Sequence, residues 1–409
     1  MSQYPLKGVR IIDFSAVWVG PAISQLLADM GAEVIRIESR RHIDLVRTYT
    51  TRVKGKPADY NIDHNVEVPI QFENYNRNKL GITLDLGNEE ARNLVIRLVS
   101  LADVVLENFP PRVMSNWGLT YEELRKVQPG IIMLSVTAAG QWGPLRDIVT
   151  YGTALGGLTG METLVGYKDD RPLGSQRDQL DPLGAVFGAF ILLAALRYRN
   201  RTGKGQHIDL SQWEAGVTTM GYSMMDWILN KRNAGRIGNK HRWSAPHGCY
   251  RCQGDDKWVS IAVTNEREWQ GLCQALGNPK WAQDKRFKDM HNRKQNEDEL
   301  DHCIEECTSK LDQYDVMYRL QRNGVAAAPS LDTIDIANGP HYKARDVWAR
   351  PITDENQIIA GVQWKLSRST GGIYRAAPPL GRDRDYVFCE LLGMTRAEIA
   401  MLDQQGIFY

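Results

Sequence analysis

Short apolar runs alternate with segments of helical spacing along the first third of the chain. The apolar runs end at turn residues and have the length of strands, and they occupy residues 9–14, 33–37, 81–86, 103–106 and 131–136. The segments between them repeat apolar positions every three or four residues, which predicts helices over residues 23–30, 89–100 and 121–127. Strands that alternate with single helices predict an α/β fold with a doubly wound, Rossmann-like parallel sheet.

A long apolar segment follows this region. Residues 183–196 are apolar on nearly every face, and a segment of this length predicts a buried core helix. No apolar run is expected to approach the roughly 18 to 20 residues of a membrane span. A further strand is predicted over residues 207–210.

The composition then changes and predicts a second domain. Residues 226–329 hold many charges and an alternating strand over 258–263, which is typical of a smaller α+β domain. Residues 1–225 form the predicted large domain. Residues 330–409, with a last helix over 395–402, are expected to return to the large domain.

Asp181 and Pro182 stand where the apolar helix begins. An aspartate at the N-cap followed by proline is a common helix start, so a capping role alone explains the pair. Alternatively, the helix dipole holds the carboxylate ionised and it acts as a nucleophile. Gly184 and Gly188 lie four residues apart, which allows close approach on one helix face. The two interpretations are compatible.

Motifs typical of several other enzymes are missing. The first strand is not followed by G-x-G-x-x-G, which disfavours a nicotinamide dehydrogenase. The chain has no G-x-S-x-G elbow and no histidine between residues 65 and 206, which argues against a Ser-His-Asp hydrolase on this sheet. A C-x-x-C at Cys249 and Cys252 has no second pair to complete a zinc site, so buried thiols are the favoured interpretation and no metal is expected.

The composition indicates which binding partners and which cellular compartment to expect. The 409 residues include 50 Lys and Arg against 49 Asp and Glu, a formal net charge of +1. Without a broad basic field, neither nucleic acid nor a membrane surface is an expected partner. Six cysteines are too few for a disulfide framework, and the N-terminus does not have the pattern of a signal peptide. A reduced, cytoplasmic setting is therefore expected.

Basic residues gather in the predicted loops of the large domain, although solvated loops explain any single one of them. As a group at one sheet edge they could bind phosphates or a carboxylate. They are Arg40, Arg41, Arg47, Arg77, Lys79 and Arg112.

Taken in order, these residues resemble the class III CoA-transferases of the carnitine and formyl-CoA transferase type. The resemblance covers almost the whole chain. It is carried by residues 5–14 (PLKGVRIIDF), 26–35 (LLADMGAEVI), 76–79 (NRNK), 102–109 (ADVVLENF), 202–206 (TGKGQ) and 245–248 (APHG).

The resemblance implies a reaction and an assembly. Asp181 matches the catalytic aspartate of the family, which attacks the thioester of an acyl-CoA donor and forms an acyl-aspartyl anhydride and then an aspartyl-CoA thioester. The acceptor is a carboxylic acid, and CoA and its thioesters are substrates, with no tightly bound cofactor. The family's protomers form an interlocked dimer, so the implied partner is a second copy or, in a hetero-oligomer, a related subunit.

The resemblance also carries over binding residues. Those that match the CoA contacts are Ala16, Val17, Trp18, Leu84, Leu86, Asn108 and Phe109. Because Gly87 and Asn116 stand where the family commonly has a lysine and an arginine, the CoA phosphates are expected to contact Arg40, Arg41 and Arg112, with Arg47 as an alternative. The residues proposed for the second carboxylate of a dicarboxylic acceptor are His42, Arg47 and Arg77.

Three positions depart from the family pattern. Gly87 and Asn116 stand where a lysine and an arginine are common, and Thr137 replaces a lysine of the formyl-CoA branch. α-Methylacyl-CoA racemases share the fold, but they place a histidine on the loop after residue 136 and this loop has none. A racemase or epimerase is therefore the weaker enzyme hypothesis.

Two further points follow from the resemblance. Residues 243–252 and 341–345 look like the branch that takes CoA from succinyl-CoA, which includes the transferase that activates benzylsuccinate in anaerobic aromatic degradation. A benzylsuccinate-like aromatic or branched dicarboxylate is therefore the expected acceptor. In paired-subunit transferases one chain can serve as a non-catalytic scaffold, but Asp181 argues that this chain is the active one.

Overall fold

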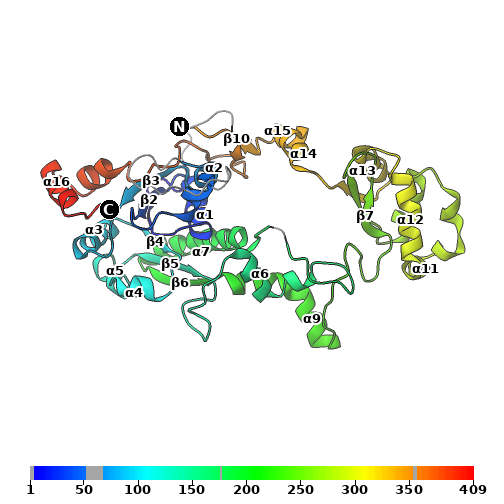
Figure 1. Ribbon diagram of the computed structural model, residues 1–409, viewed down its shortest axis with the longest axis horizontal. Coiled ribbons are helices and arrows are strands. Elements are labelled where there is room, and N and C mark those ends of the chain that lie inside the picture. The colour runs from blue at the N-terminus through cyan, green and yellow to red at the C-terminus, as the bar shows by residue number, and fades with distance from the viewer. Residues whose placement is uncertain (1–3, 52–67, 176, 353–356) are drawn as a thin grey trace. The chain divides into compact units, whose positions relative to one another are not determined.

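Six parallel strands form the main sheet of the protein in a computed structural model, which describes residues 4–51, 68–175, 177–352 and 357–409 (Figure 1). The strands are β1 (Arg10–Asp13), β2 (Glu33–Glu38), β3 (Lys79–Thr83), β4 (Val104–Glu107), β5 (Ile132–Thr137) and β6 (Gln206–Ser211). Their order is β3-β2-β1-β4-β5-β6, and every neighbouring pair is parallel. The predicted α/β fold is confirmed. The order reverses between β1 and β4, where open sheets of this kind bind ligands.

Alternating side chains of the strands fill two cores, one on each face of the sheet. Ile11 and Val34 face α1 (Val19–Ala28) and α7 (Leu180–Thr202). Ile12 and its neighbours face the opposite core. The helices that cover this second face are α3 (Glu89–Val99), α5 (Tyr121–Val127) and α16 (Arg396–Gln404).

Helix α7 corrects one expectation from the sequence. It spans 23 residues, and among the described residues it is the one helix long and apolar enough, by length and composition, to cross a membrane. The sequence interpretation considered only residues 183–196, whereas the helix extends past both ends of that segment. Ala185, Leu192 and Leu196 are buried in the core against the sheet, whereas Val186 and Phe190 are exposed, so α7 is buried on one face and not on all faces.

The chain divides into two units. The first contains residues 1–162, 175–233 and 345–409, and the second contains residues 163–174 and 234–344. These bounds differ from the boundaries at residues 225 and 329 that the sequence predicted. One reason is that Lys257 forms ion pairs with Asp332 (2.7 Å) and Asp335 (2.8 Å), which ties residues beyond 329 to the second unit.

The first unit has several shorter elements. Its other helices are α2 (Ile70–Asn76), α4 (Arg112–Asn116), α6 (Gly152–Thr159), α8 (Gln212–Val217) and α9 (Gly221–Asn230). Strands β10 (Trp348–Ala349) and β11 (Ile359–Ala360) form a small antiparallel pair. The C-terminal segment docks on this unit, where Arg77 donates to the carbonyl oxygen of Ala360 (2.5 Å) and Asp383 accepts from the amide of Gly81 (2.8 Å).

The second unit is built on an antiparallel sheet of β7 (His247–Arg251), β8 (Trp258–Ala262) and β9 (Ala326–Pro329). Its helices are α10 (Glu266–Ala275), α11 (Met290–Gln295), α12 (Glu297–Thr308), α13 (Gln313–Arg322), α14 (Thr333–Asn338) and α15 (Pro340–Ala344). Trp269, Phe287 and Leu300 are buried in its core. Cys252 is buried and Cys249 lies 3.6 Å from the hydroxyl of Ser330, and all six cysteines are free thiols.

Three cations and three carboxylates are buried together near the ends of β1, β2 and β3. We call them the buried charge cluster, and its members are Asp13, Arg36, Glu38, Asp44, Arg47 and Lys79. The ammonium of Lys79 lies 3.1 Å from a carboxylate oxygen of Asp13, and both side chains are fully buried. Burial lowers the pKa of Lys79 to about 8 even though Asp13 opposes the shift. The balanced charges allow the cluster to stay ionised out of contact with water.

Replacing Lys79 with methionine should destabilise the protein by about 3–5 kcal/mol, because it leaves the Asp13 carboxylate buried without its cation. The measurement is the free energy of unfolding from urea titration. The matched control is Lys126→Met, since Lys126 forms an exposed ion pair with Glu123 and should change stability by less than about 1 kcal/mol. Equal losses in the two variants would contradict a role for the buried pair.

Candidate active site

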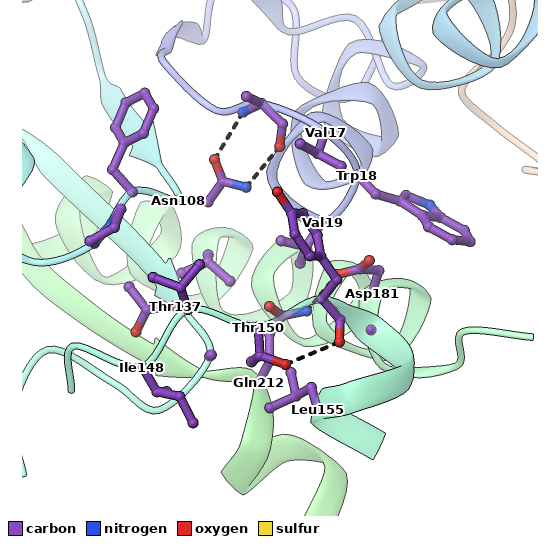
Figure 2. A pocket seen from close by; sticks show the side chains of 18 of the residues that line it. Val17, Trp18, Val19, Asn108, Thr137, Ile148, Thr150, Leu155, Asp181 and Gln212 are labelled. Atoms are coloured by element: carbon purple, nitrogen blue, oxygen red, sulfur yellow. Dashed lines mark hydrogen bonds between the residues drawn. The ribbon is translucent and has the colours of Figure 1, made fainter. Parts of the chain in front are cut away.

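The turn between β1 and α1 is held by two polar side chains from other parts of the sheet. Asn108, which follows β4, accepts from the amide of Ala16 (2.9 Å) and donates to the carbonyl oxygen of the same residue (2.8 Å), as Figure 2 shows. Asp44 accepts from the amide of Val17 (3.1 Å), which lies in the left-handed region at φ 67°. The backbone at the switch point is therefore fixed by side-chain hydrogen bonds.

Asp181 lies in the first turn of α7, next to this turn. The helix begins at Leu180 and Gln179 precedes it, so Asp181 is not the N-cap that the sequence suggested. Gln212, at the start of α8, donates to the Asp181 carboxylate at 2.7 Å. Gly184 lets α7 approach α1, because a Cβ there would lie 3.1 Å from Val19.

The electrostatics of Asp181 differ from the sequence prediction. Burial and the neighbouring carboxyl of Asp178 raise the pKa of Asp181 to about 7, and the hydrogen bond from Gln212 opposes the shift only in part. The prediction that the helix dipole holds this group ionised is therefore wrong at acidic pH, because desolvation and a like charge outweigh the dipole. A carboxyl that ionises near neutral pH is suited to nucleophilic or acid–base chemistry.

A cavity of about 240 Å³ opens beside Asp181. Of the predicted contacts, it is lined by Ala16, Val17, Trp18, Asn108 and Phe109. The sequence interpretation missed Gln212 and Arg146, which also line it. Gln212 directly follows β6. Its position as a polar residue at the carboxyl end of a strand could have identified it from the sequence. Arg146 lies on an irregular loop, so no sequence pattern pointed to it.

Thr137 lies at the end of β5 and lines the same cavity. Its side chain is 7% exposed, and its hydroxyl has no hydrogen-bond partner among the residues that the structure describes. A buried hydroxyl without a partner is costly, so its donor is available to a group that enters the cavity.

A second hollow of about 460 Å³ lies next to the first, and Ala16 and Phe109 border both. It collects a further set of predicted residues from the ends of β2 and β3 and the segments that follow them. These are Arg41, His42, Leu84 and Leu86. The first unit thus holds two adjacent spaces that share one wall.

The structure places the remaining predicted residues elsewhere. Arg47 is buried and pairs with Glu38 (2.7 Å), and Arg77 is buried and pairs with Asp29 (2.7 Å). Their guanidinium groups already have carboxylate partners. Arg40 borders a different hollow near the C-terminus, and Arg112 is exposed, 4.0 Å from Asp147. We therefore leave these four arginines out of the candidate site.

The sequence raised two alternatives to a nucleophilic Asp181, a histidine base as in a racemase and a metal site. None of the residues that line the cavity beside Asp181 is a histidine. Across the described parts of the chain, no group of three or more His, Cys, Asp or Glu side chains is placed to hold a metal ion.

Comparison with known proteins gives a consistent result. A model of CoA-transferase family III matches residues 6–384. A succinyl-CoA–D-citramalate CoA-transferase of Chloroflexus aurantiacus is 32% identical and covers 98% of both chains. The alpha subunit of a succinyl-CoA–L-malate CoA-transferase of the same organism is 30% identical, over 99% of this chain and 93% of that one. A crystal structure of a CAIB/BAIF family protein from Brucella suis is similar with a TM-score of 0.84 and 29% identity, over 96% of this chain and 100% of that one.

The pKa of Asp181 predicts how stability depends on pH. Because this pKa is raised when the protein is folded, the protonated form contributes stability that is fully present below pH 3.8 and is lost as pH rises through about 7. Asp181→Asn should therefore gain stability relative to the natural protein between pH 5 and pH 8, by at least about 1 kcal/mol. Thermal unfolding across this range tests it, with the exposed Asp385→Asn as control. A constant difference between the natural protein and Asp181→Asn would contradict the raised pKa.

Proposed function

This chain belongs to CoA-transferase family III, and from that membership we propose that it moves CoA from succinyl-CoA to a dicarboxylic acid with Asp181 as the nucleophile. The observation that carries the proposal is the Asp181 carboxylate beside the cavity, hydrogen-bonded to Gln212 and with its pKa near 7. At neutral pH a large fraction of Asp181 is ionised, and its position at the cavity wall suits attack on a bound thioester.

The proposed reaction exchanges one acyl bond for another. An Asp181 oxygen attacks the thioester carbonyl, the carbon–sulfur bond breaks, and an anhydride forms with release of CoA thiolate. The thiolate attacks the aspartyl carbonyl and releases succinate, which leaves an aspartyl-CoA thioester. The acceptor carboxylate displaces the thiolate, and the thiolate then attacks the acceptor carbonyl and frees Asp181. These steps need neither a metal nor a redox cofactor, because no electrons are transferred and each intermediate is an activated acyl group.

Two groups in the cavity support this chemistry. Gln212 orients the Asp181 carboxylate through its hydrogen bond. Thr137 has a buried hydroxyl that can donate to the oxyanion that develops on a carbonyl oxygen at each step.

The second hollow is our proposed position for the nucleotide end of CoA. Leu84, Leu86 and Phe109 offer apolar surface for the adenine, and Arg41 and His42 lie on the same rim. Arg41 is exposed, and its ion pair with Asp85 at 3.2 Å can be exchanged for a phosphate. The pantetheine arm would cross the shared wall at Ala16 and Phe109 to bring the thioester to Asp181.

Arg146 is our proposed contact for the distal carboxylate of the acceptor. It is the one cationic side chain among the described residues that line the cavity, and its neighbours Ile148, Val149 and Tyr151 are largely apolar. Its ion pair with Asp147 at 3.4 Å is exposed, unlike the buried pairs of Arg47 and Arg77, so it can be exchanged for a substrate carboxylate. A cation beside apolar side chains suits a dicarboxylate with a carbon branch. D-Citramalate and L-malate, named in the relatives, and the benzylsuccinate expected from the sequence all have two carboxylates, so they form the acceptor panel.

Exposed apolar side chains support the proposed dimer. Phe190 on α7 is 68% exposed and Leu229 on α9 is 70% exposed, with Val186, Met225 and Ile228 also exposed on these helices. Apolar surface of this kind favours a protein partner. We propose that a second copy of the chain or a related subunit covers it in an interlocked dimer.

The reaction class can be tested by trapping. Incubation with succinyl-CoA followed by hydroxylamine should place a hydroxamate on the peptide that carries Asp181, because hydroxylamine attacks an activated acyl carbon. Peptide mass spectrometry detects it, and Asp181→Asn should give no adduct and no turnover while the protein remains folded. A variant at Asp181 that retains normal turnover would refute the proposal.

The acceptor contact can be tested by kinetics. Arg146→Gln should raise the KM for a dicarboxylic acceptor by about tenfold or more, because it removes a charged hydrogen bond. Turnover with a donor acyl-CoA and an acceptor that both lack a distal carboxylate measures any general damage. Arg125→Gln, which removes an exposed arginine from α5, is the control. An unchanged acceptor KM would remove Arg146 from the site.

A further inference from the structure

We propose that Asp178 is a positioning residue that holds the protonated form of Asp181 by a hydrogen bond and repels Asp181 when it is ionised, and that Gly152 is required to make room for it. The inference deepens the proposed function and rests on Asp181 being the nucleophile. Neither Asp178 nor Gly152 was identified from the sequence.

The carboxylate of Asp178 is fixed from two sides. One of its oxygens accepts from the amide of Leu180 at 3.0 Å, which ties it to the first turn of α7. When Asp181, three residues along the chain, is protonated it donates a hydrogen bond to Asp178, which raises the pKa of Asp181. Asp181 therefore has two side-chain partners, the Asp178 carboxyl and the Gln212 amide.

The space that Asp178 occupies exists only because residue 152 is glycine. A Cβ built on Gly152 would lie 1.6 Å from one carboxylate oxygen of Asp178 and 1.9 Å from its carboxyl carbon. Any side chain at the start of α6 would therefore displace the Asp178 carboxyl. The glycine and the aspartate form a complementary pair, although 26 residues separate them in the sequence.

The groups that face the two carboxyls from neighbouring elements carry little charge. Val19 from α1, Leu155 from α6 and Gln212 from α8 are uncharged, and Arg146 lines the same cavity from its loop. Glu162 lies against Gly156, one turn along the same face of α6 from Gly152, and its oxygens accept from Ser175. Asp178 is the carboxylate whose charge raises the pKa of Asp181.

This arrangement has a consequence for acyl transfer. When both carboxyls are ionised they repel each other in a partly buried site. When Asp181 becomes an anhydride or a thioester it loses its charge, so the repulsion disappears. Asp178 thereby disfavours the free nucleophile relative to the covalent intermediates, and it raises the basicity of the attacking oxygen.

The test uses the first half-reaction, so it needs no acceptor. The natural protein is mixed with succinyl-CoA between pH 5 and pH 9, and the single-turnover rate of acylation at Asp181 is followed by hydroxylamine trapping. Asp178→Asn keeps an oxygen that can accept from Leu180 but removes the charge. We expect the midpoint of the acidic limb to move down by about one pH unit and the rate at high pH to fall severalfold. Glu122→Gln, an exposed change on α5, is the control.

A double-mutant cycle tests the role of Gly152. Gly152→Ala should shift the acylation midpoint in the same direction as Asp178→Asn and lower the melting temperature, because it forces the Asp178 carboxyl to move. In an Asp178→Ala background the same substitution should have little effect on either quantity, since the obstructing carboxyl is gone. Additive effects would show that Gly152 acts independently of Asp178 and would overturn that part of the proposal.

The outcomes separate this inference from the proposed function. If the natural protein forms the Asp181 adduct and the midpoint is unchanged in Asp178→Asn, the inference fails and the proposed function stands. If no adduct forms with the natural protein, the proposed function fails, and the pH dependence of thermal unfolding in Asp178→Asn still decides whether Asp178 raises the pKa of Asp181. An unchanged pH dependence there overturns the inference as well.

Discussion

The guanidinium of Arg36 is the charge on which the active-site turn depends. It is fully buried, pairs with Asp44 and donates to Asn76 at 2.9 Å. Asp44 in turn accepts from the amide of Val17, which holds that residue in its left-handed conformation. A buried cation requires compensation, and the carboxylate that supplies it also fixes the backbone next to the cavity. The charge balance of the core and the shape of the site are therefore parts of one network.

The candidate site lies at the switch point of the sheet, between β1 and β4. After β1 and after β4 the chain continues in opposite directions along the sheet. Asn108, which follows β4, links the two segments by hydrogen bonds to the backbone of Ala16, which follows β1. Helix α7 brings Asp181 to the same edge because Gly184 and Gly188 let it pack closely against α1, where a Cβ at residue 188 would lie 2.4 Å from Ile23. Asp181 and the cavity wall are thus held by close packing of the helices together with side-chain hydrogen bonds from Asn108 and Gln212.

The sequence predicted the regular elements well where the periodicity was strong. The expected strands over residues 33–37 and 131–136 correspond to Glu33–Glu38 and Ile132–Thr137. The start of α7 was less well predicted, because Asp181 followed by Pro182 resembles an N-cap while the helix begins at Leu180. Local capping preferences place a helix end only to within a residue or two, since tertiary packing selects among neighbouring starts.

By itself, the sequence determined the alternation of strands and helices, the parallel sheet, and Asp181 as the residue with candidate chemistry. Apolar periodicity encodes these features locally, and the family resemblance added the reaction. The tertiary structure decided which charges are free to bind substrate. Arg47 and Arg77 looked like loop cations in the sequence but are buried beside Glu38 and Asp29. Pairing between residues far apart in the chain depends on the folded packing, and so does the cost of burying a charge, so neither can be read from spacing alone.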